Sequence, residues 1–149
     1  MDDKLSALRS RAAALSAAPA SSDARIGYKT MREGIAEQND CAVRALHMAT
    51  RMSYTESHAL LARFGRADGK GTQFVTTFVP AAVAAGLERH STQSRTLGQF
   101  LKAEGARGIW VIGMTDHFAT YVDGRCVSDS WGTGLRTRLH RAYIWKAAD

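Results

Sequence analysis

Residues 108–129 have the sequence GIWVIGMTDHFATYVDGRCVSD, and this stretch decides the fold. Its apolar run from Gly108 to Met114 is typical of a central strand, and residues 117–122 and 125–129 predict two further strands. We expect a last strand over residues 135–145. The preceding chain predicts helices, so the order of elements indicates an α+β domain in which N-terminal helices pack on a C-terminal antiparallel sheet.

Two helices are predicted ahead of the sheet with clear start signals. Residues 40–52 predict a helix with Asn39 or Asp40 as its N-cap. Ser53 and Glu56 have the spacing of a capping box, which restarts a helix directly afterwards. Residues 73–86 are also expected to be helical, and Pro80 must kink that helix or begin a new one.

The length of 149 residues suits one hydrophobic core and is short for two domains. Residues 3–17 predict an alanine-rich helix followed by a linker, so we expect residues 1–25 to form an appendage and residues 26–149 a single domain. Two cysteines without CxxC spacing suggest neither a disulfide framework nor a zinc site. We therefore expect a reduced, cytoplasmic chain with no membrane span, metal or cofactor.

The formal charge of +6 and the pI near 9.7 favour acidic partners. Much of the positive charge lies near the two ends of the chain, so an acidic protein partner could bind through the basic termini. Nucleic acid is not expected, because the sequence has no RNA-binding aromatic signature and no zinc-finger spacing. A merely solvated basic face is the alternative interpretation.

Cys41 is the first candidate for chemistry, because it stands where a helix is predicted to begin. Unpaired N–H groups and the positive end of the helix dipole at such a position favour a thiolate over a thiol. The backbone N–H of Cys41, with Gln38 or Asn39 as a second donor, would lie where an oxyanion develops during acyl transfer. The competing interpretation is a buried structural cysteine.

His117 and Asp129 are predicted to face each other across a hairpin. A three-residue loop at Val122–Gly124 pairs His117 with Asp129, with Cβ atoms about 4.5–5.5 Å apart. A two-residue turn would instead pair Phe118 with Asp129 and put His117 on the other face. In the three-residue register Cys126 lies on the face opposite His117, where we expect an inert core thiol.

These residues resemble the papain-like cysteine peptidase superfamily. The segment DSWGTG at residues 129–134 is similar to that family's Asn-Ser-Trp-Gly-Thr-Gly segment, with Asp in place of Asn. Asp40-Cys41 resembles the bacteriocin-processing branch, and NDCAVRAL at residues 39–46 resembles small papain-like proteins encoded by phages. The resemblance covers roughly residues 36–134, and its specific identity is confined to these short stretches.

The resemblance implies a role for each residue. Cys41 would be the nucleophile, His117 the general base and acid, and Asp129 the residue that orients the imidazole. Trp131 would shield the contact between His117 and Asp129 from water. Gln38 is the best oxyanion candidate, although the family's glutamine usually lies further upstream of the cysteine.

The implied function is a thiol hydrolase of bacterial or phage origin that cleaves an amide or isopeptide bond in a protein or peptide through a thioester. Two alternatives stay open. One is a glutamine deamidase or transglutaminase-type effector with the same triad. The other is a non-enzymatic interaction protein that holds an acidic partner on its basic helix and on residues 136–140.

Overall fold

The computed structural model describes residue 6 and residues 32–114, 117–128 and 134–147. Its elements, in chain order, are α3 (Cys41–Ala49), α4 (Tyr54–Arg63), the π-helix η1 (Phe74–Phe78), α5 (Val79–Ala84), β1 (Glu88–His90), α6 (Leu97–Ala103), β2 (Ile109–Met114), β3 (His117–Val122), β4 (Arg125–Cys126) and β5 (Leu139–Lys146). The expected appendage of residues 1–25 lies outside the described residues, apart from Ser6.

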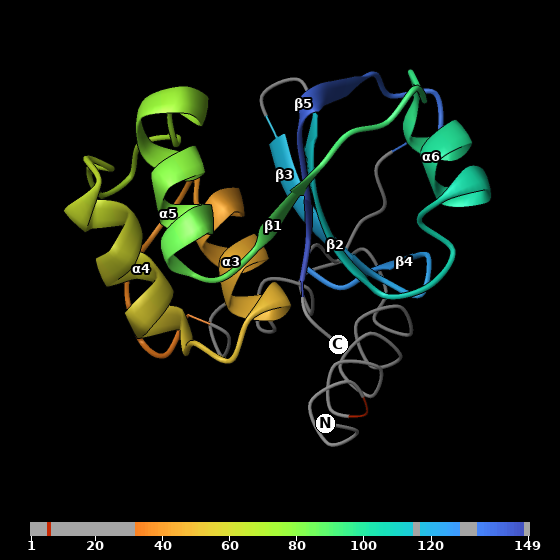
Figure 1. Cartoon of the computed structure of the whole chain (residues 1–149). Coiled ribbons are helices and arrows are strands. Elements are labelled where there is room, and N and C mark those ends of the chain that lie inside the picture. Colours follow the sequence, from red (N-terminus) through yellow and green to blue (C-terminus); the bar gives the residue numbers. More distant parts are fainter. Residues whose placement is uncertain (1–5, 7–31, 115–116, 129–133, 148–149) are drawn as a thin grey trace.

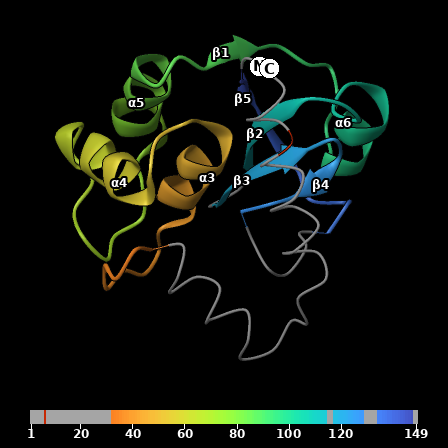
Figure 2. The ribbon, with the colours of Figure 1, turned by 90° about the horizontal axis from the view of Figure 1, so that it is seen from below.

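One antiparallel sheet stands between two helical layers. Helices α3, α4 and α5 lie on one side of the sheet and α6 on the other, as Figure 1 and, from below, Figure 2 show. The strand order is β1-β5-β2-β3-β4, and every neighbouring pair is antiparallel. The predicted α+β class with an antiparallel sheet is confirmed. Among the described helices, none has both the length and the apolar character needed to span a bilayer.

The sheet differs from the sequence prediction at its margins. β2 and β3 lie where they were predicted, but β4 ends at Cys126 and β5 begins only at Leu139. Strand β1 was not predicted, since its three residues carry no apolar alternation and two of them are exposed. Its pairing with β5 is a tertiary contact that short local patterns do not reveal.

Strand β3 separates two hydrophobic clusters by simple alternation. Phe118 and Val122 belong to the cluster on the α3 side, whereas Ala119 and Tyr121 belong to the cluster on the α6 side. Thr120 also faces α3, where its hydroxyl donates to the carbonyl oxygen of Ala45 at 2.6 Å. Successive side chains of a strand point to opposite faces, so this pattern is what the pleat requires.

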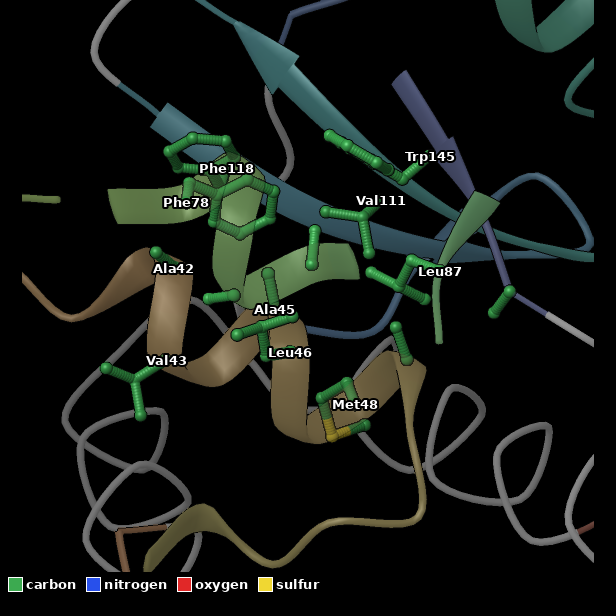
Figure 3. Close-up of a cluster of buried hydrophobic side chains, with 14 of the residues drawn as sticks. Ala42, Val43, Ala45, Leu46, Met48, Phe78, Leu87, Val111, Phe118 and Trp145 are labelled. Atoms are coloured by element: carbon green, nitrogen blue, oxygen red, sulfur yellow. The ribbon is translucent and has the colours of Figure 1, made fainter. Parts of the chain in front are cut away.

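Helix α3 is buried on nearly all sides, as its apolar sequence predicts. Ala42, Ala45 and Ala49 are fully buried, and their small side chains let the helix lie close to β3. In Figure 3, Phe118 and Phe78 lie beside Ala42 at the first turn of α3, while Met48 lies towards the other end. The first turn of α3 therefore meets the beginning of β3.

The predicted break at Pro80 is confirmed. The π-helix η1 runs directly into α5, and Pro80 stands in the first turn of α5, a position that tolerates proline. The wider π turn places two aromatic rings on β3. The ring centroids of Phe78 and Phe74 lie 4.0 and 4.5 Å from that of Phe118.

The hairpin register with a three-residue loop is wrong. Val122 pairs with Arg125 and Tyr121 with Cys126, which leaves a two-residue turn at Asp123 and Gly124. Both turn residues have positive φ, at 48° and 80°. This conformation matches the right-handed twist of the strands. The Asp123 carboxylate also accepts from the backbone N–H of Gly108 at 2.9 Å and fixes the turn against the start of β2.

Gly113 is required by the close approach of β5, because a Cβ there would lie 2.8 Å from Cβ of Tyr143 and 3.0 Å from its carbonyl oxygen. We expect Gly113→Ala to lower the free energy of unfolding by about 1–3 kcal/mol, measured by urea denaturation. Gly71→Ala is the matched control, since a Cβ at Gly71 meets nothing within 4 Å. Equal losses in the two variants would contradict the packing at Gly113.

Candidate active site at the start of helix α3

Cys41 is the first residue of α3 and is half-buried. Asp40 occupies the N-cap position, as predicted, but its side chain makes no capping hydrogen bond. The first helical bond runs from the backbone N–H of Arg44 to the carbonyl oxygen of Asp40 at 3.0 Å. The N–H groups of the first turn are therefore not satisfied by their N-cap side chain. These N–H groups are the donors that a helix start offers to an acceptor group.

The Asp40 carboxylate makes other contacts instead of capping. It is 1% exposed and accepts two hydrogen bonds from Arg32, both at 2.8 Å, and one from the Tyr54 hydroxyl at 2.7 Å. Arg44 approaches the same carboxylate at 3.2 Å. Burial alone would raise the pKa of Asp40, but these partners outweigh burial and hold the pKa well below its usual value. Burial and the bond to Asp40 raise the pKa of Tyr54.

Arg44 connects this carboxylate to the chain that leads into Asp129. Its side chain is buried and donates a hydrogen bond to the carbonyl oxygen of Ser128 at 2.6 Å. The Ser128 hydroxyl in turn accepts from the backbone N–H of Thr120 at 2.9 Å. The segment immediately before Asp129 is thus fixed between β3 and the first turns of α3. Asp129 and Trp131 themselves lie outside the described residues.

His117 is the first residue of β3 and is half-buried. It lies at the end of β3 that meets the first turn of α3. Alternation along β3, however, groups His117 with Ala119 and Tyr121, on the α6 side. Its cross-strand partner Met114 belongs to the same cluster. We expected His117 to approach Cys41 directly across the helix–sheet interface. Strand alternation instead places the position of His117 on the face away from α3.

The edge of the sheet is close to His117. Strand β4 pairs with Tyr121 and Val122, and Val127 donates one further backbone bond to Thr120. Strand β4 covers only Arg125–Cys126 and therefore ends before the level of His117.

The two oxyanion candidates precede Cys41 on an exposed stretch. Asn39 has a φ of 51°, a conformation that asparagine tolerates better than most residues. Its side-chain amide donates to the carbonyl oxygen of Gly69 at 2.9 Å. The amide of Gln38 also lies against Gly69, where a Cβ would meet its nitrogen at 3.4 Å. Both side chains are exposed and contact the loop at Gly69.

Cys126 lies opposite Tyr121 and packs against the cluster on the α6 side. The prediction that it would lie on the face opposite His117 is wrong, because the two-residue turn shifts the register by one residue. By alternation, Cys126 and His117 lie on the same face of the sheet. Cys126 nonetheless lies on the other side of the sheet from α3.

A buried ion-pair network holds the segment before Cys41, and sequence reasoning missed it. The Glu37 carboxylate accepts from the Arg66 guanidinium at 2.8 Å and from the backbone N–H of Gly69 at 2.6 Å. His58 lies 2.9 Å from Glu37 and 3.1 Å from Asp68. Glu37 and Arg66 are far apart in the sequence, so no local spacing indicates their contact.

The possible ligand atoms of Glu37, His58 and Asp68 lie within 4.8 Å of one another. This separation would suit a metal ion, but the Glu37 oxygen nearest His58 also receives the bond from Arg66, whose side chain is 1% exposed. A cation bound there would face a fixed, buried positive charge at close range. The network therefore acts as an ion-pair support for the segment that leads to Cys41.

This network predicts a loss of stability in acid. Burial would raise the pKa of Glu37, but the bonds from Arg66 and from two backbone N–H groups lower it from 4.5 to about 2. A lowered folded-state pKa contributes stability above the unfolded-state value and loses it as pH falls from 4.5 towards 2. We expect Glu37→Gln to flatten the pH dependence of the unfolding free energy across this window. An unchanged slope in urea titrations would contradict the assignment.

Comparisons with protein-family models, with curated proteins and with solved structures return no match.

Proposed function

We propose that the protein is a cysteine-dependent hydrolase that cleaves an amide or isopeptide bond in a protein or peptide. The observation on which this proposal depends is Cys41 at the start of α3, half-buried and beside first-turn N–H groups that the N-cap carboxylate does not satisfy. A thiol in this position is favoured as a nucleophile. The proposal also includes a papain-like arrangement of the helix start and the sheet.

The reaction proceeds in two steps. The Cys41 thiolate attacks the carbonyl carbon, the C–N bond breaks, and His117 gives its proton to the leaving amine. Water then attacks the thioester while His117 takes a proton from it, the C–S bond breaks, and the carboxylic acid leaves with the Cys41 thiolate and the protonated His117 restored. The backbone N–H of Cys41, with Gln38 or Asn39, stabilises the oxyanion in both steps.

His117 and Asp129 complete the proposed triad, and Trp131 shields them. Support comes from two contacts at the same end of α3. The start of β3 lies by the first turn of the helix, and Arg44 fixes the Ser128 carbonyl, one residue before Asp129. The triad requires the His117 ring to reach the α3 side around the edge of β3.

Alkylation rates test the nucleophile without knowledge of the substrate. We expect iodoacetamide at neutral pH to modify Cys41 at least about tenfold faster than Cys126, because Cys41 is the proposed nucleophile and Cys126 packs against the cluster on the α6 side. Intact-mass spectrometry of wild type, Cys41→Ala and Cys126→Ala separates the two rates. Equal rates, or faster reaction at Cys126, would contradict the proposal.

The reaction class is tested with two kinds of probe. Fluorogenic peptide amides report hydrolysis, and glutamine-containing peptides report ammonia release. Amine release from the peptide amides supports the hydrolase, whereas ammonia release alone would assign the site to glutamine deamidation with the same nucleophile.

A further inference from the structure

Positive charge is more frequent in the second half of the described chain than in the first. Residues 88–147 contain nine Lys and Arg against five Asp and Glu, whereas residues 32–87 contain six against five. Three exposed arginines gather beside α6, namely Arg95, Arg136 and Arg138. With the exposed Leu135 they form what we call the arginine patch.

Backbone pairing brings the members of the arginine patch together. Thr96 forms a bridge with Arg138, and the N–H of Leu139 donates to the carbonyl oxygen of Arg95 at 3.0 Å. The two segments therefore lie side by side, with Arg95 next to the Arg138 segment. None of the three arginines forms an ion pair with any residue of the described chain.

Leu135 and Arg136 occupy a turn that α6 holds in place. The N–H of Thr137 donates to the carbonyl oxygen of Gly134 at 3.0 Å, which closes the turn. The N–H groups of Leu97 and Gly98 donate to the carbonyl oxygens of Thr137 and Leu135 at 2.9 and 2.8 Å. The turn is thus preorganised, which lowers the entropy cost of binding.

The side chain of Leu135 is 62% exposed at the tip of this turn. A single exposed leucine is common on protein surfaces. Leu135 differs because its backbone is held by Gly98 and because it directly precedes Arg136, which has no carboxylate partner in the described chain. An apolar contact surrounded by positive charge is complementary to an apolar side chain flanked by Asp or Glu.

We propose that the arginine patch binds an acidic segment of a protein partner, with an apolar side chain of that segment on Leu135. A protein partner is favoured over nucleic acid because the patch contains no aromatic side chain on which bases could stack. The patch lies across the sheet from α3, so this binding does not depend on the proposed reaction of Cys41.

Fluorescence anisotropy with a short labelled peptide of Glu, Asp and Leu tests the proposal. All measurements use the Cys41→Ala chain, so failure of the proposed hydrolase leaves the result interpretable. We expect the combined Arg136→Gln and Arg138→Gln substitutions to weaken binding about tenfold, and Leu135→Ser to weaken it several-fold. Binding should also weaken steeply as the NaCl concentration rises.

Two controls separate this site from general charge attraction. The combined Arg51→Gln and Arg63→Gln substitutions remove the same charge from exposed arginines on the α3–α4 side and should change the affinity less than about twofold. A peptide with Gln and Asn in place of Glu and Asp should not bind. Equal loss in the two arginine pairs, no binding of the acidic peptide, or tighter binding of a DNA oligonucleotide would overturn the proposal.

Discussion

Cys41→Ser is expected to lower the hydrolysis of fluorogenic peptide amides by at least about a thousandfold relative to wild type, because removal of a nucleophile abolishes the covalent step. A serine hydroxyl is not ionised near neutral pH, so the helix start cannot turn it into an equivalent nucleophile. The measurement is the initial rate on the peptide amide that wild type cleaves fastest. Intact-mass spectrometry of wild type should also detect the acyl-enzyme.

Cys126→Ser is the matched control, because Cys126 is also half-buried but lies on the α6 side of the sheet. It should keep the rate of wild type within about twofold, and both variants should unfold at urea concentrations close to that of wild type. Hydrolysis that survives in Cys41→Ser, or that disappears in Cys126→Ser, would contradict the assignment of the nucleophile.

Asp40→Ala is expected to reduce the free energy of unfolding by about 3–5 kcal/mol, the typical cost of removing one partner of a buried ion pair. The substitution leaves Arg44 buried and Arg32 without its carboxylate, and the Tyr54 hydroxyl loses its acceptor. Each of these groups gave up contact with water on folding. The loss of its partner therefore costs more free energy than the loss of a single surface contact. Urea denaturation monitored by tryptophan fluorescence measures the loss.

Asp68→Ala is the control for Asp40→Ala, since Asp68 is 78% exposed and contacts only the half-buried ring of His58 among the described residues. Its loss should cost less than about 1 kcal/mol. If Asp40→Ala does not fold, Tyr54→Phe removes one bond to the same carboxylate and should cost about 1–2 kcal/mol. If Asp40→Ala and Tyr54→Phe each lower the free energy of unfolding by less than Asp68→Ala does, the buried network is contradicted.

The long apolar runs were predictable from the sequence because their physics is local. The run from Gly108 to Met114 is buried on both faces in β2, and His117–Val122 forms β3 with the predicted bounds. The capping box of Ser53 and Glu56 is present with both of its hydrogen bonds. Periodicity and capping depend on residues that are close together along the chain, so both can be recognised from the sequence.

The sequence alone does not decide the hairpin register, because a two-residue and a three-residue loop both fit the residues. The contact of Asp123 with Gly108 stabilises the two-residue turn, and this partner lies on another strand. Similarly, the predicted N-cap role of Asp40 fails as a side-chain contact because Arg32 and Tyr54 compete for its carboxylate. Both outcomes depend on tertiary neighbours.

The candidate site was predictable in part. The sequence placed Cys41 at a helix start and His117 at a strand start, and the structure has both. It gave no sign that Arg44 reaches Ser128 or that Arg66 supports Glu37, because these contacts join segments that only the fold brings together. The relation between Cys41 and His117 is the central part of the proposed mechanism.

The pH dependence of Cys41 alkylation tests this relation most directly. If His117 accepts the thiol proton, His117→Ala should lower the alkylation rate near neutral pH by at least about tenfold and shift the rising limb of the profile to higher pH. His90→Ala is the control, because His90 is bound to Glu104 at 2.9 Å beside α6 and should leave the profile unchanged. A profile for His117→Ala that coincides with that of wild type would contradict the proposed catalytic pair.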